Sequence, residues 1–123
     1  MSSAMTVRRM KTHTAETGYV YQYYFVGNRP ALPGATGNPA TEYVFDVSSD
    51  RKTTYAVSIF IGELAAQQWA ESHGRPLNDA ERYAAAKLAL LRTFDTVEDL
   101  LAGSRRVMVS GKDIEEMLTP LLG

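Results

Sequence analysis

The chain has 123 residues, of which 45% are hydrophobic and 22% are charged, as in an ordinary globular domain. Thirteen basic and fourteen acidic residues leave a net charge of −1, which argues against a protein devoted to coating nucleic acid or an anionic membrane. The absence of cysteine excludes disulfides and cysteine-ligated metals. We therefore predict a single cytoplasmic domain with no membrane-spanning segment.

The N-terminal part divides into a polar arm and an aromatic strand. Residues 1–17 are rich in Thr, Ser and Arg, and we predict that they form a flexible arm preceding one α+β domain at 18–123. Residues 19–26 read Tyr-Val-Tyr-Gln-Tyr-Tyr-Phe-Val, a composition that suits a pleated strand. Because both faces of this strand are largely apolar, we expect it to be central in a sheet or covered on both sides.

Residues 27–41 contain three prolines and three glycines, which interrupt regular structure. This pattern predicts a loop of unusual length, and such loops are commonly functional or disordered. The segments 42–48 and 53–61 then alternate apolar and polar residues and predict a β-hairpin. Matching their apolar faces favours a three- or five-residue loop within 49–53.

The C-terminal half predicts helices. A helix over 63–73 ends at Gly74, and Asn78 with Glu81 forms a capping box that begins a second helix. A bend near residue 95, a short third helix before residue 103 and a short closing strand at 105–109 follow. A final helix begins near residue 110 and is expected to end near residue 118, because Pro120 disfavours helix before it. The predicted fold is α+β: a three- to four-stranded antiparallel meander packed against two to four amphipathic helices.

No pattern of residues indicates catalysis. The two histidines, His13 and His73, lack the spacing that places two imidazoles on one helix face, and no nucleophile motif is present. We therefore predict no catalytic residue, no metal site and no cofactor.

The leading hypothesis for function is a small, non-catalytic interaction module that forms a homodimer or binds another protein. More apolar surface is present than the short helices cover easily, and self-association commonly buries such a surplus. The predicted interface residues are Val44, Phe60, Leu88, Leu121 and Leu122.

Two alternatives remain open. A nucleic-acid-associated regulator would use the basic arm and the tyrosine-rich strand, with the candidate residues Arg8, Arg9, Lys11 and Tyr21. A small-molecule-binding or enzymatic domain would have its pocket under the 27–41 loop. The candidate residues for that pocket are Tyr23, Glu42, Asp46 and His73.

Overall fold

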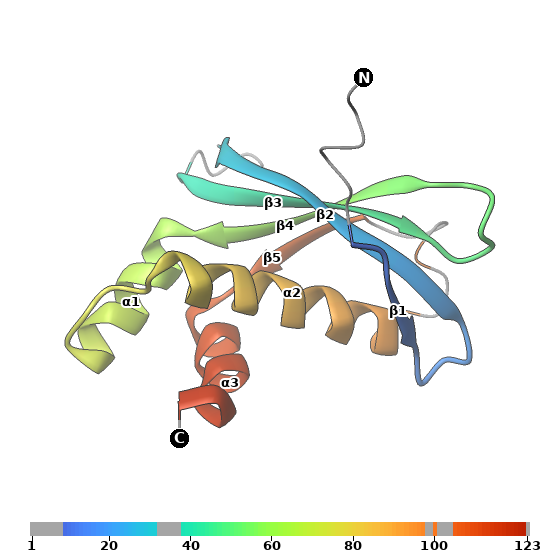
Figure 1. Ribbon diagram of the computed structural model, residues 1–123. Helices are drawn as coiled ribbons and strands as arrows, with labels where there is room; N and C mark the ends of the chain where they lie inside the picture. The colour runs from blue at the N-terminus through green and yellow to red at the C-terminus, as the bar shows by residue number, and fades with distance from the viewer. Residues whose placement is uncertain (1–8, 32–37, 98–99, 101–104, 123) are drawn as a thin grey trace.

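The protein is a two-layer α+β domain with one mixed sheet and three helices (Figure 1). The computed structural model describes residues 9–31, 38–97, 100 and 105–122, without the side chain of Leu122. The elements in chain order are β1 Lys11–Thr14, β2 Val20–Ala31, β3 Ala40–Ser48, β4 Tyr55–Gly62, α1 Glu63–His73, α2 Asp79–Thr96, β5 Arg106–Val109 and α3 Gly111–Leu122.

The strands lie in the order β1-β2-β3-β4-β5, so neighbours in sequence are neighbours in the sheet. The first four strands are antiparallel, whereas β5 pairs parallel with β4. The predicted antiparallel sheet of three to four strands is therefore corrected to a mixed sheet of five. The connection from β4 to β5 contains α1 and α2 among its described residues, and a helical crossover of this kind returns the chain in the same direction.

Strand β2 is longer than predicted, because it continues past Val26 to Ala31. The predicted loop over 27–41 therefore contributes strand residues at both ends, and its residues 32–37 lie outside the described part. Beyond Tyr23, β2 pairs only with β3 among the described residues, and such an edge tolerates Pro30. A bulge at Val26 shifts the register between Phe25 and Gly27.

Part of the predicted N-terminal arm is a strand, since residues 11–14 form β1 at the sheet edge. The His13 imidazole lies 2.9 Å from the Asp95 carboxylate, which joins β1 to the last turn of α2. The same carboxylate accepts a hydrogen bond from the Glu16 backbone N–H at 3.1 Å. Residues 1–8 lie outside the described part.

The β3–β4 hairpin has the predicted faces but a longer loop. Val47 pairs with Tyr55, which keeps the two apolar sets in step. The loop between the end of β3 at Ser48 and the start of β4 at Tyr55 is longer than the predicted three or five residues. Asp50 stabilises it by accepting hydrogen bonds from the backbone N–H groups of Lys52 and Thr53, while Arg51 adopts a φ of 65°.

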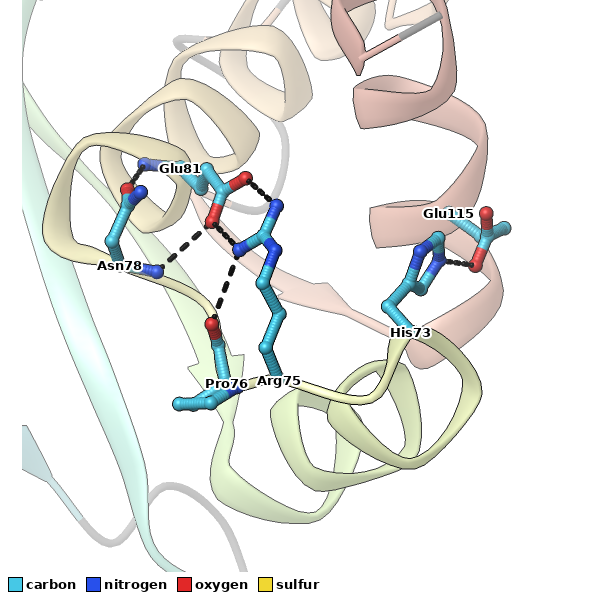
Figure 2. A network of polar contacts seen from close by, with 6 residues as sticks. All are labelled: His73, Arg75, Pro76, Asn78, Glu81 and Glu115. Atoms are coloured by element: carbon cyan, nitrogen blue, oxygen red, sulfur yellow. Dashed lines mark hydrogen bonds and ion pairs between the residues drawn. The ribbon is translucent and has the colours of Figure 1, made fainter.

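The predicted bounds of α1 and the predicted start of α2 are confirmed. Gly74 ends α1 with a left-handed φ of 72°. The Asn78 side chain accepts a hydrogen bond from the Glu81 N–H, and the Glu81 carboxylate accepts one from the Asn78 N–H (Figure 2). Arg75 holds the same carboxylate at 2.7 and 2.8 Å.

One prediction about the C-terminal helices was wrong and another is not tested. Helix α2 ends at Thr96, next to the predicted bend near residue 95, and most of the predicted third helix lies outside the described residues. The last helix was predicted to end near residue 118, but α3 continues through Pro120 to Leu122. The loss of one backbone hydrogen bond in the last turn is tolerated, since Ile114 and Leu118 bury the helix against the core.

All three helices lie on the same side of the sheet (Figure 1). Between them and the strands lies the core, where the Tyr21 and Phe94 rings stack at 4.2 Å. Trp69 anchors α1 with 2% of its surface exposed. Among the described residues, no helix has the length and apolarity that crossing a bilayer requires.

Candidate functional site

A cleft of about 750 Å³ opens where the sheet and the helices diverge. Its lining comes from two parts of the chain, the β2–β3 hairpin and the first turns of α1 and α2. The sheet contributes Phe25, Asn28, Thr41 and Tyr43, and the helices contribute Glu63, Asp79, Arg82 and Tyr83.

Local structure fixes where the two helices begin beside this cleft. Helix α1 follows β4 directly, and the Glu63 N–H donates a hydrogen bond to the Pro39 carbonyl at 3.0 Å. The capping box at Asn78 fixes the first turn of α2. As a result, Glu63 and Asp79 each occupy the first position of a helix, where the helix dipole stabilises a carboxylate.

Three aromatic rings form the apolar part of the cleft. Tyr83 meets Phe25 edge-on, with ring centroids 5.0 Å apart. Phe25 lies 6.2 Å from Tyr43 in the neighbouring strand. Aromatic walls with a few polar groups are typical of small-molecule sites.

The polar part of the cleft contains an ion pair. The two terminal nitrogens of Arg82 each lie 3.3 Å from a Glu63 carboxylate oxygen. The Thr41 hydroxyl donates to the same carboxylate at 3.2 Å. Glu63 is thereby fixed by the sheet and by α2 together.

Four other polar side chains of the cleft have no hydrogen-bond partner among the described residues: Asn28, Tyr43, Asp79 and Tyr83. Tyr43 is only 4% exposed, whereas Asp79 is exposed. Burial raises the pKa of the Tyr43 hydroxyl; Arg82 opposes this shift, and Asp79 and Glu63 reinforce it. The hydroxyl is therefore neutral at pH 7 and lies within electrostatic range of all three charges.

The opposite face of the sheet bears a separate polar network, and none of the described helices lies on it (Figure 1). Glu42 accepts hydrogen bonds from the Arg29 side chain at 2.8 Å and from the Ser58 hydroxyl at 2.6 Å. These bonds hold the pKa of Glu42 below its usual value of 4.5, with Arg29 the main cause. The Val26 bulge makes this possible, because it brings Arg29 opposite Glu42.

The four residues predicted to bind a ligand do not converge. Tyr23 is buried on the helix-covered face, while Glu42 and Asp46 lie on the open face, where Asp46 accepts a 2.8 Å hydrogen bond from Tyr24. His73 stacks on Trp69 at the end of α1 and contacts Glu115 at 2.8 Å (Figure 2). None of the four lines the cleft.

The residues predicted to bind nucleic acid lie partly at the surface and partly in the core. Arg9 and Lys11 are exposed near β1, and Arg8 lies outside the described part. Tyr21 is 1% exposed and stacks on Phe94, so a base does not reach its ring in this arrangement. Nucleic-acid binding by the basic residues stays a prediction.

The predicted interface residues also lie in different places. Val44 is half-buried on the open face, and Phe60 is 3% exposed beneath Arg106, whose guanidinium lies 5.0 Å from the ring. Leu88 packs against the core from α2, and Leu121 is exposed on α3. The Leu122 side chain lies outside the described part.

Sequence reasoning missed the residues of the cleft. A weak signal was available, because Glu63 and Asp79 both follow a helix-start pattern and carry acidic side chains. Nothing in the sequence indicated that the two helix starts meet beside Tyr43. In the described part of the chain, no group of three or more histidine, aspartate or glutamate side chains is arranged to hold a metal ion.

The described residues form a two-layer α+β domain with an open cleft of polar and aromatic side chains. Comparison with protein-family models, curated proteins and solved structures finds no significant match to this chain.

Proposed function

We propose that the protein is a small-molecule-binding domain whose ligand occupies the cleft between the β2–β3 hairpin and the starts of α1 and α2. The observation that carries this proposal is the Tyr43 hydroxyl, which lines the cleft without a described partner although its residue is almost fully buried. The hydroxyl reaches the open cleft, and a ligand that covered it would have to supply a hydrogen-bond partner, because covered polar groups are normally hydrogen-bonded.

A fragment screen by ¹H–¹⁵N correlation spectroscopy tests this proposal. Binding fragments are expected to shift the backbone amides of Asn28, Tyr43 and Arg82 before any others. The variant Asn28→Trp fills the cleft from an exposed strand position and should abolish these shifts. The control Thr12→Trp places the same side chain on β1 outside the cleft and should leave them intact.

Hits that bind Asn28→Trp and the parent chain equally would place the ligand site elsewhere. A screen without hits at the cleft would count against small-molecule binding altogether. Because Asn28 and Thr12 are both exposed, each variant is expected to keep the circular dichroism spectrum of the parent chain.

Self-association through the open face is a second candidate function. Val20 and Met108 on this face are 41% and 58% exposed, and Val44 lies between them. The face also bears both signs of charge, Arg29 and Glu42 among them, and a two-fold axis brings such a patch against itself. This arrangement supports the homodimer predicted from the sequence.

Native mass spectrometry tests the second candidate. The parent chain should be a dimer, and Val44→Lys should convert it to a monomer by placing an unpaired charge in the interface. The control Leu64→Lys introduces the same charge at an exposed position on α1 and should remain dimeric. A monomeric parent chain would exclude the homodimer.

A further inference from the structure

The charges of the cleft do not cancel. Arg82 places both terminal nitrogens on Glu63, and this pair neutralises itself. Asp79 lines the same cleft and forms no ion pair among the described residues. The site therefore retains one negative charge, which favours a ligand that carries a positive charge.

The aromatic walls favour the same kind of ligand. Phe25, Tyr43 and Tyr83 surround the apolar part of the cleft, with Phe25 in contact with both tyrosines. A cation is attracted to the face of an aromatic ring, and the attraction increases where water is excluded. An apolar body attached to the cation would pack against the same rings.

The Tyr43 hydroxyl supplies a hydrogen-bond acceptor. It stays protonated and uncharged at neutral pH, because the ordinary tyrosine pKa of 10.0 lies well above 7 and burial raises the pKa of Tyr43 further. A neutral phenol accepts a hydrogen bond from an ammonium or amidinium N–H through its oxygen. Asp79 would accept a second, charge-assisted bond.

We infer that the ligand of the cleft is a small organic cation, an ammonium or amidinium group on an apolar or aromatic body. Asp79 and Tyr43 bind its charged nitrogen, and the rings of Phe25 and Tyr83 pack against its body. This inference rests on the proposed function, because it assigns a chemical class to the ligand of the same cleft.

Three probes of nearly equal shape test the inference: benzylammonium, neutral benzyl alcohol and anionic benzoate. Titrations followed by ¹H–¹⁵N spectra at pH 7 report the affinity and the site together. Benzylammonium should bind with a Kd of about 1–10 mM, as its few heavy atoms allow. It should bind roughly two- to fivefold more tightly than benzyl alcohol, because Asp79 is exposed and a cation contact at an exposed site corresponds to about that factor.

Charge removal at one residue completes the test. Asp79→Asn keeps the size of the side chain and should reduce the affinity for benzylammonium to that for benzyl alcohol. Glu71→Gln removes an exposed carboxylate of α1 that does not line the cleft, and should leave the affinity unchanged. Equal losses in both variants would show a nonspecific effect of net charge and overturn the inference.

The remaining outcomes separate this inference from the proposed function. Equal binding of all three probes at the cleft would overturn the cation preference and leave a small-molecule site in place. Tighter binding of benzoate would identify Arg82 as an anion-binding residue and also overturn it. No shift at the cleft with any probe would count against both proposals.

Discussion

The two faces of the sheet are held by different interactions. The covered face buries rings and branched side chains against the helices, with Phe45 and Ile59 of the sheet and Phe94 of α2 all 0% exposed. The open face keeps carboxylates in place with hydroxyl and guanidinium partners, as Glu42 and Asp46 show. The comparison indicates that the covered face provides most of the stability. The open face and the cleft retain polar side chains at the surface.

The largest effect should follow from removing a ring of the covered face. Phe94→Ala removes the ring that stacks on Tyr21 and touches Tyr23, and should cost about 3–5 kcal/mol of unfolding free energy. Urea denaturation measures this loss. The control Val26→Ala, at the 39% exposed bulge, should cost no more than about 0.5 kcal/mol. Similar losses of unfolding free energy at the two positions would contradict the conclusion that the covered face provides most of the stability.

A smaller effect is expected from the polar network of the open face. Glu42→Gln keeps the shape of the side chain but replaces the charged acceptor of Arg29 and Ser58, and should cost about 1–2 kcal/mol at pH 7. The control Glu71→Gln, at an exposed position of α1, should be near neutral.

The effect of Glu42→Gln should depend on pH. The pKa of Glu42 is depressed below 4.5 in the folded state, so its contribution is complete above that pH and is lost as the pH falls through the folded pKa. The difference between parent and variant should therefore shrink on acidification below pH 4.5. A difference that stays constant would show that charge does not stabilise this network.

The capping box lies at the border between the covered face and the cleft. Asn78→Ala removes the acceptor of the Glu81 N–H and should cost about 1 kcal/mol. Hydrogen exchange should locate the loosening in the first turn of α2, which carries Asp79 and Arg82. The exposed substitution Ser72→Ala, on α1, is the matched control. Uniform loosening of the whole domain would show that the cap does not act locally.

The parts of the fold that could be predicted are those set by local chemistry. Gly74 and the pair Asn78 and Glu81 mark helix ends through hydrogen bonds within a few residues, and the structure contains these bonds. The alternation on either side of the β3–β4 turn likewise assigned the right side chains to the core. Such signals need no knowledge of distant contacts.

What could not be predicted depends on tertiary context. Pro30 lies in a strand because β2 is an edge there, and the Val26 bulge exchanges the faces of all residues that follow it. Tyr43, Asp79 and Arg82 meet only after the sheet and both helices have packed. Choosing Glu42 or His73 by residue type alone therefore selected side chains that already have protein partners.

The smallest effect on stability should come from the cleft itself. Tyr43→Phe removes a hydroxyl that has no described partner, so the unfolding free energy should change by less than about 0.5 kcal/mol. The control Tyr24→Phe removes a hydroxyl bonded to Asp46 and should cost about 1 kcal/mol. Urea denaturation of the two variants compares them directly.

The same pair of variants relates stability to binding. If the Tyr43 hydroxyl serves a ligand, Tyr43→Phe should weaken benzylammonium binding while leaving stability intact, and Tyr24→Phe should do the reverse. A loss of more than about 1 kcal/mol in Tyr43→Phe would show that the hydroxyl has a structural partner. The reason for assigning it to a ligand would then disappear, because the hydroxyl would already have its partner within the protein.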